Sequence, residues 1–147
     1  MNINYKTYRI WRVLLDSPNE WLSVMDVAHD VNMTSRQVSS IVNTISSPNI
    51  IKERDANNKE LYITVQGTPE EILQIKTQVM YDYYGISPNM CGQVKNTLSP
   101  IGWMTVGDIS DDTGIERLNV SRILSILPNV VSKGSGSVTM YRLKGVI

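Results

Sequence analysis

The chain has 147 residues, and its 14 basic residues balance its 14 acidic ones, which gives a net charge of zero and a pI of about 6.6. Its 41% hydrophobic and 19% charged residues are typical of an ordinary globular protein and exclude a disordered or membrane-embedded chain. Because no apolar run approaches the length of a membrane span and the amino terminus lacks a signal-peptide pattern, we expect a cytoplasmic protein without a membrane partner.

The first predicted element is a helix from Tyr5 to Leu15, which ends before Pro18. The stretch that follows, residues 17–45, occurs a second time at residues 99–127, where nine of the 29 aligned positions are identical. An internal repeat of this kind indicates two copies of one structural unit. Both copies begin Ser-Pro-x-x-Trp, and we expect the equivalent tryptophans, Trp21 and Trp103, to be buried in the cores.

A second helix is predicted at the start of each copy. The hydroxyl-x-x-acid patterns that begin at Ser23 and Thr105 are capping boxes, which satisfy unpaired amides where a helix starts. Apolar residues at helical spacing follow each box. The helices then meet Asn32 and Gly114, residue types that tolerate the left-handed backbone that ends a helix.

A third helix and a β-hairpin complete each copy. Thr34 is a good cap for the third helix of the first copy, whereas Glu116 is a poorer cap in the second. The expected buried stripes are Val38, Ile41, Val42 and Ile45 in the first copy and Leu118, Val120, Ile123, Leu124 and Leu127 in the second. The predicted hairpin strands are residues 50–54 with 60–65 and residues 130–133 with 137–143, because alternating apolar residues flank polar tips.

One predicted helix has no counterpart before the first copy. Thr68-Pro69-Glu70-Glu71 carries the signals of a helix start, and the helix runs to about Tyr84. We interpret it as a connector. The predicted division is domain 1 at residues 1–67, the connector at 68–86 and domain 2 at 87–147.

The connector ends in a group of tyrosines: Tyr81, Tyr83 and Tyr84. Such amphipathic aromatic residues are favoured at interfaces. They either pack between the two domains or form the seam of a homodimer or of a contact with a protein partner.

A helix, a helix-turn-helix and a β-hairpin, present twice, resemble the winged helix-turn-helix domain. The predicted fold class is therefore mainly α with small β-hairpins (α+β), with two winged helix-turn-helix domains in tandem joined by a connector helix. The resemblance covers nearly the whole chain. Members of that superfamily mostly bind double-stranded DNA, with the third helix in the major groove and the hairpin wing on the backbone or minor groove. A sizeable minority are protein–protein interaction modules.

The resemblance implies a transcriptional regulator that reads double-stranded DNA with exposed polar residues of each third helix. These residues are Ser35, Arg36, Ser39, Ser40 and Asn43 in the first copy and Arg117, Asn119, Ser121, Arg122 and Ser125 in the second. The candidate phosphate-binding residues of the wings are Lys52, Arg54, Lys59 and Lys133. We expect Arg122 to read bases, because arginine pairs bidentately with guanine, and Lys133 to contact phosphate.

The net charge is zero, but the charged residues are unevenly distributed along the chain. From Arg117 to Ile147 there are five basic residues and no acidic one. Since phosphate neutralisation supplies most non-specific affinity for DNA, the second copy is the better candidate for DNA binding. The alternative is a protein–protein interaction module built from the same tandem domains without DNA binding.

The sequence predicts no catalytic, metal or cofactor site. The one histidine, His29, and the one cysteine, Cys91, are far apart in the chain, which argues against a Cys-His dyad or a zinc site. Cys91 also cannot form an internal disulfide, which suits a reducing compartment. The segment Gly134-Ser135-Gly136 lies at a predicted hairpin tip and not between a strand and a helix, so it is not a phosphate loop. We expect a protein that is not an enzyme.

Overall fold

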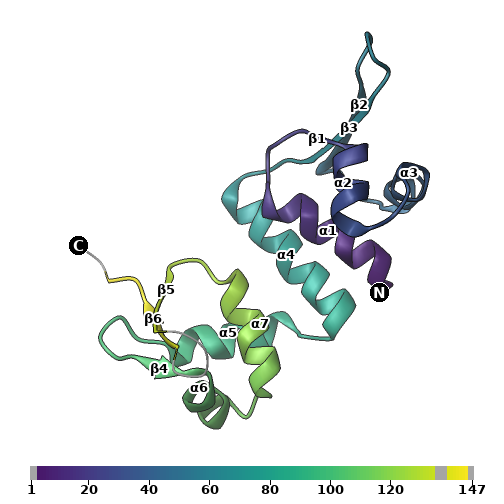
Figure 1. The fold of residues 1–147 in the computed structure, drawn as a ribbon. Helices are drawn as coiled ribbons and strands as arrows, with labels where there is room; N and C mark the ends of the chain where they lie inside the picture. Colours follow the sequence, from purple (N-terminus) through teal and green to yellow (C-terminus); the bar gives the residue numbers. More distant parts are fainter. Residues whose placement is uncertain (1–2, 135–138, 146–147) are drawn as a thin grey trace. The chain divides into compact units, whose positions relative to one another are not determined.

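A computed structural model describes residues 3–134 and 139–145 (Figure 1). The described residues form seven helices and two three-stranded antiparallel sheets, so the predicted α+β class with small β elements is confirmed. The chain divides into two compact units between Tyr83 and Tyr84. The predicted hairpin tip at residues 135–136 and the first residues of the predicted strand, 137–138, lie outside the described residues.

The first unit contains four helices and three strands. Its elements are α1 (Tyr5–Asp16), β1 (Leu22–Ser23), α2 (Val24–Val31), α3 (Ser35–Thr44), β2 (Ile50–Arg54), β3 (Leu61–Val65) and α4 (Pro69–Tyr84). Helix α1 packs against both α2 and α3. Helix α4, predicted as a connector, contributes Ile72 and Val79 to the buried core of this unit.

The second unit repeats this order without a counterpart of α4. Its elements are α5 (Pro88–Thr97), β4 (Met104–Thr105), α6 (Val106–Thr113), α7 (Arg117–Ile126), β5 (Val130–Lys133) and β6 (Met140–Leu143). Helix α5 packs against α6 and α7, as α1 packs against α2 and α3. Ile109, Val120 and Ile123 are fully buried at the centre of these contacts.

Each sheet has a short third strand that the sequence analysis did not predict. The strand orders are β1-β3-β2 and β4-β6-β5. In the first sheet Leu22 of β1 and Lys52 of β2 pair with Ile63, and in the second Met104 of β4 pairs with Tyr141. Strands β1 and β4 have two residues each, which is too short for an alternating pattern to be visible in the sequence.

The helix starts follow the predicted caps. Thr34 and Gln37 form a capping box, and Thr105 and Asp108 form another, with hydrogen bonds of 3.0 and 3.1 Å in each. Glu116 makes no side-chain cap hydrogen bond. A shorter hydroxyl side chain at this position would satisfy an amide that the glutamate leaves to solvent.

The turn between the second and third helices contains a left-handed residue in both units. Asn32 has φ of 55° and Gly114 has φ of 75°. Asparagine and glycine adopt this conformation with less steric strain than other residues, so α2 and α6 end where the sequence predicts.

The expectation that both repeated tryptophans are core residues is wrong for Trp21, which is 42% exposed, and Trp103 is only partly buried. The pairing register explains this result. Leu22 pairs with the fully buried Ile63, and successive side chains of a strand point to opposite faces, so Trp21 lies on the outer face of the sheet.

Leu118, expected in the buried stripe of α7, is 58% exposed. The buried face of that helix consists of Val120, Ile123 and Leu124. Leu118 precedes Val120 by two positions, which places the two side chains on different sides of a helix.

The two helix caps yield a first prediction. Replacing Thr34 with alanine removes its capping box and should lower the free energy of unfolding by about 1 kcal/mol, whereas Glu116→Thr should raise it by about 0.5–1 kcal/mol. Urea denaturation followed by circular dichroism measures both changes. A Glu116→Thr variant less stable than the parent chain would contradict the account of the α7 start.

Candidate functional site

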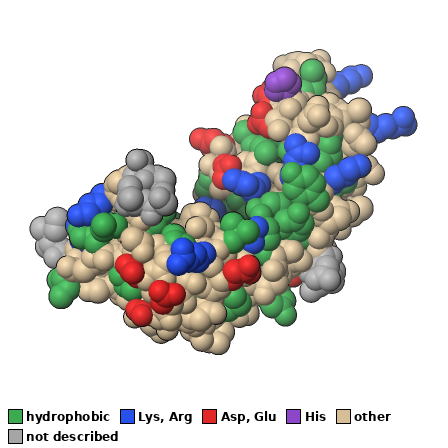
Figure 2. All heavy atoms as spheres, turned by 60° about the horizontal axis from the view of Figure 1, so that its bottom comes forward, with side chains coloured by type: hydrophobic (Ala, Val, Ile, Leu, Met, Phe, Trp, Pro, Cys, Tyr) green, Lys and Arg blue, Asp and Glu red, His purple; other side chains and the backbone are tan. Residues whose placement is uncertain are grey.

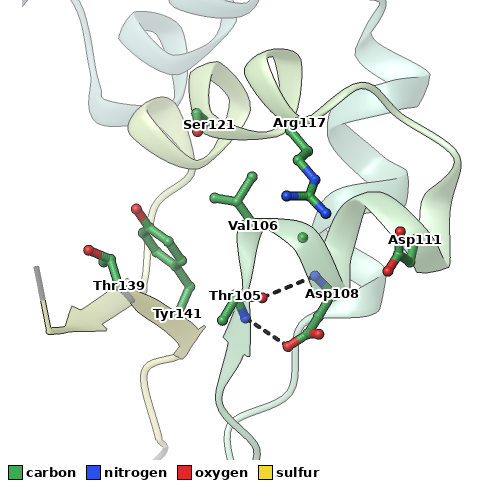
Figure 3. A pocket seen from close by; sticks show the side chains of 9 residues that line it. Thr105, Val106, Asp108, Asp111, Arg117, Ser121, Thr139 and Tyr141 are labelled. Carbon is green, nitrogen blue, oxygen red and sulfur yellow. Dashed lines mark hydrogen bonds between the residues drawn. The ribbon is translucent and has the colours of Figure 1, made fainter. Parts of the chain in front are cut away.

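A cleft of about 430 Å³ opens in the second unit between α6, α7 and the sheet (Figure 3). It is lined by Thr105, Val106, Gly107, Asp108 and Asp111 at β4 and α6, by Arg117 and Ser121 of α7, and by Thr139 and Tyr141 at β6. Figure 3 shows Arg117 reaching from α7 toward the first turn of α6, and Tyr141 pointing from the sheet toward α7. Polar side chains from three elements thus meet around one hollow.

Arg117 lies directly over Gly107. A Cβ atom added to Gly107 would be 3.2 Å from Nη2 and 3.3 Å from Cζ of Arg117, so the absence of a side chain at residue 107 makes room for the guanidinium. Glycine within a helix is less stable than alanine, so Gly107 lowers the stability of α6 while it makes room for Arg117. Among the described residues, Arg117 has no hydrogen-bond or ion-pair partner, and it is exposed.

The acidic side of the cleft is already partly organised. Oδ2 of Asp108 accepts a hydrogen bond of 3.0 Å from the amide of Thr105, and Oγ1 of Thr105 accepts one of 3.1 Å from the amide of Asp108. The other carboxylate oxygen of Asp108 and the exposed carboxylate of Asp111 remain available as acceptors.

The first unit has apolar residues at three positions where the second unit has glycine or a residue with a hydroxyl group around this cleft. Met25 is equivalent to Gly107, and Leu61 and Ile63 are equivalent to Thr139 and Tyr141, since Leu22 pairs with Ile63 as Met104 pairs with Tyr141. Ile63 is fully buried, and Leu61 packs against the core. Met25 is 61% exposed, so the two units differ here in the chemistry of the lining residues.

Arg122, which we expected to read bases, makes contacts within its own unit. Its guanidinium carbon lies 3.8 Å from the centre of the Tyr84 ring, and its Nη1 donates a 3.0 Å hydrogen bond to Oδ1 of Asn119. Two of the expected α7 site residues, Asn119 and Arg122, are thus brought together and partly buried, whereas Ser121 and Ser125 are exposed.

Lys133 belongs to a cluster on the outer face of the second sheet. Its Nζ lies 4.4 Å from the centre of the Trp103 ring, and Cζ of Arg142 lies 4.8 Å from it. Arg142 also donates hydrogen bonds of 3.0 and 3.2 Å to the carbonyls of Pro100 and Leu143. Our sequence analysis did not select Arg142, although the hairpin pairing that places it on the same face as Lys133 is a usable signal.

The expected site residues of the first unit are arranged differently. Ser35, Arg36 and Ser40 are exposed on α3, and Ser39 is half-buried. Nζ of Lys52 donates a 2.7 Å hydrogen bond to Oδ1 of Asn43, which links β2 to α3. Arg54 donates one of the same length to the carbonyl of Lys59.

The tyrosines at the end of α4 have separate surroundings. The ring of Tyr83 stacks on Tyr8 of α1 with centres 4.1 Å apart and an angle of 8°, and it lies 6.2 Å from Tyr5. Tyr84 contacts Arg122, and Tyr81 is 44% exposed. Tyr83 and Tyr84 therefore contribute to packing within the chain.

Charge on the surface is mixed. On the face drawn in Figure 2, basic side chains lie among acidic and uncharged ones and form no continuous patch. Within residues 3–134 and 139–145, no group of three or more metal-ligating residues converges, and no helix is long and apolar enough to cross a membrane. Burial raises the pKa of the Cys91 thiol, which disfavours the reactive thiolate.

Comparisons with known proteins give little guidance. No family model matches the chain, and no curated protein matches it. Among solved structures, it is similar to a crystal structure of the DIP2311 protein from Corynebacterium diphtheriae, with a TM-score of 0.33, 16% identity and coverage of 95% of this chain. The chain spans 26% of that protein's length. A TM-score this low carries no argument about fold or function.

The pair of Gly107 and Arg117 yields a second prediction. Because the atoms nearest a new Cβ belong to the end of a flexible, exposed side chain, Gly107→Ala should displace the guanidinium and still raise the free energy of unfolding by about 0.5–1 kcal/mol. Thermal and urea denaturation measure the change. A clear loss of stability would show that Arg117 is held in place more firmly than its contacts indicate.

The contact between Arg122 and Tyr84 yields a third prediction. In a double-mutant cycle of Arg122→Ala and Tyr84→Leu, the two side chains should show a coupling energy of about 0.5–2 kcal/mol, because a cation rests on the ring face. The cycle isolates this pair from the other contacts of Tyr84. A coupling energy of zero would contradict this prediction and show that the Tyr84 ring does not hold Arg122 in place.

Proposed function

We propose that the protein binds double-stranded DNA as a transcriptional regulator, through two tandem winged helix-turn-helix domains. In this proposal α3 and α7 are the third helices that enter the major groove, and the β2–β3 and β5–β6 hairpins are the wings. The observation that carries the proposal is the concentration of cations on α7 and the adjoining sheet, in a stretch from Arg117 to Ile147 that contains no acidic residue.

The repeated architecture supports this proposal. In both units a left-handed residue joins two short helices, and an antiparallel hairpin follows the second of them. The outer surface of α3 carries short hydroxyl and amide side chains, which allow close approach to a groove and contact bases or phosphates.

The contacts in the structure suggest a division of roles among the cations. Arg36 and Arg117 are exposed near the starts of α3 and α7 and have no hydrogen-bond partner among the described residues, so they are the better base readers. Arg122 is held by Tyr84 and Asn119 and would position α7. Lys133 is exposed on the wing side and would contact phosphate.

The fourth prediction tests DNA binding. Lys133→Ala should weaken binding to all duplexes alike and make the dependence of log affinity on log salt shallower by about one unit. Arg36→Ala should cost about 1–3 kcal/mol at a preferred sequence and relax that preference. Fluorescence anisotropy across a salt series with a selected and a random duplex measures both effects.

Lys95→Ala provides the control, because it removes one exposed cation from α5, outside the proposed interface. It should leave the sequence preference unchanged. No measurable duplex binding at about 50 mM salt, or equal effects of all three substitutions, would refute the proposal.

A second candidate function is a protein–protein interaction module. It is favoured by the outer face of the first sheet, where Trp21 is 42% exposed and Ile51 is 40% exposed. In the second unit the equivalent Trp103 contacts two cations, and in the first no such contact is present among the described residues. This candidate gains support if the anisotropy experiment shows no duplex binding.

A further inference from the structure

We propose that the cleft of the second unit binds a nucleoside monophosphate, with the phosphate on Arg117 and the sugar hydroxyls on the carboxylates of α6. The inference concerns a small-molecule site and does not depend on DNA binding.

The first step is that the cleft results from specific substitutions between two copies of one unit. Where the first unit has Met25, Leu61 and Ile63, the second has Gly107, Thr139 and Tyr141. Each of these changes removes apolar volume or adds a polar group. Val24 is 4% exposed, whereas its counterpart Val106 is partly exposed on the cleft floor. Met25 is 61% exposed, so its exchange for Gly107 changes the surface and not the core. A binding function explains why the second unit has glycine and polar residues at these positions.

The second step concerns the anion. Arg117 has no partner among the described residues, and its guanidinium lies over a glycine at the start of α6. A planar guanidinium binds phosphate oxygens bidentately. The hydroxyl of Ser121, one helical turn along α7, lines the same side of the cleft. These groups favour a phosphate.

The third step distinguishes a free nucleotide from a DNA backbone. Asp108 and Asp111 line the cleft beside Arg117 (Figure 3). Their carboxylates accept hydrogen bonds from ribose hydroxyls, as acidic residues do in dinucleotide-binding sites, whereas the sugars within a DNA strand have no free hydroxyl. A nucleoside monophosphate can therefore place its phosphate on Arg117 and its sugar hydroxyls on the two carboxylates.

The fourth step concerns the base and the size. The side chain of Val106 and the ring of Tyr141 provide apolar surface, and rings of this kind stack with nucleobases. The volume of about 430 Å³ is within the range of about 300–1,000 Å³ of small-molecule sites. A mononucleotide thus matches the charge, the hydroxyl acceptors and the size of the cleft.

The site also has a consequence for α7. Arg117 and Ser121 belong to the helix that we propose enters DNA, so a bound nucleotide would occupy groups that a duplex also uses. If DNA binding is established, the nucleotide should therefore act as a competitor.

Isothermal titration of the full chain with adenosine 5′-monophosphate, without DNA, tests the site. We expect saturable binding with a Kd between about 10 μM and 1 mM. Adenosine and inorganic phosphate should each bind about tenfold more weakly or worse, because each lacks part of the recognised group. Arg117→Ala should weaken binding about tenfold or more, and Arg117→Lys less, since lysine keeps the charge but loses the fork.

Gly107→Met introduces the residue of the first unit and should also weaken binding, because a side chain at residue 107 displaces the Arg117 guanidinium. Lys95→Ala should leave binding unchanged. Circular dichroism establishes that each variant is folded. The proposal is overturned if no heat is measured up to about 5 mM nucleotide, if phosphate alone binds as tightly as the nucleotide, or if folded Arg117→Ala and Gly107→Met variants bind normally. Loss of DNA binding in the anisotropy experiment would leave this result unaffected.

Discussion

The left-handed residue between the second and third helices is the constraint on which both units depend. Asn32 and Gly114 reverse the chain within a few residues, so that α3 and α7 return to pack on the helices before them. A residue restricted to right-handed backbone would cost about 1–2 kcal/mol here and would favour a longer second helix. The burial of Val38 and Val120 then fixes which side of the third helix remains exposed.

The two copies share this arrangement of helices and turns but differ in the side chains at equivalent positions. The first unit buries Ile63 in its core and leaves Met25 and Trp21 exposed. The second opens a cleft at Gly107 and covers Trp103 with two cations. The helix starts and turns are therefore alike in the two copies, whereas the residues around the repeated tryptophan and at Met25 and Gly107 differ.

Caps, turns and helix periods are local in sequence, which is why the helices and the hairpins could be predicted from it. The outward direction of Trp21 could not, because it depends on pairing with β3, about forty residues away in the chain. The cleft was also missed, since no motif marks a glycine that accommodates an arginine from another helix. Helical spacing alone predicted that Arg122 is exposed. Its contact with Tyr84 could not be predicted in this way, because the two residues are far apart in the sequence. Candidate sites were thus less predictable than the elements that carry them.

The most direct test of the DNA-binding account is an NMR titration of the ¹⁵N-labelled chain with a duplex at low salt. Amide shifts should change along α3, α7 and β5 and should remain unchanged along α1 and at Tyr81. Their magnitude should fall as salt is added, because phosphate contacts release counterions. Changes confined to Trp21, Ile51 and Tyr81, or no change at saturating duplex, would contradict the account.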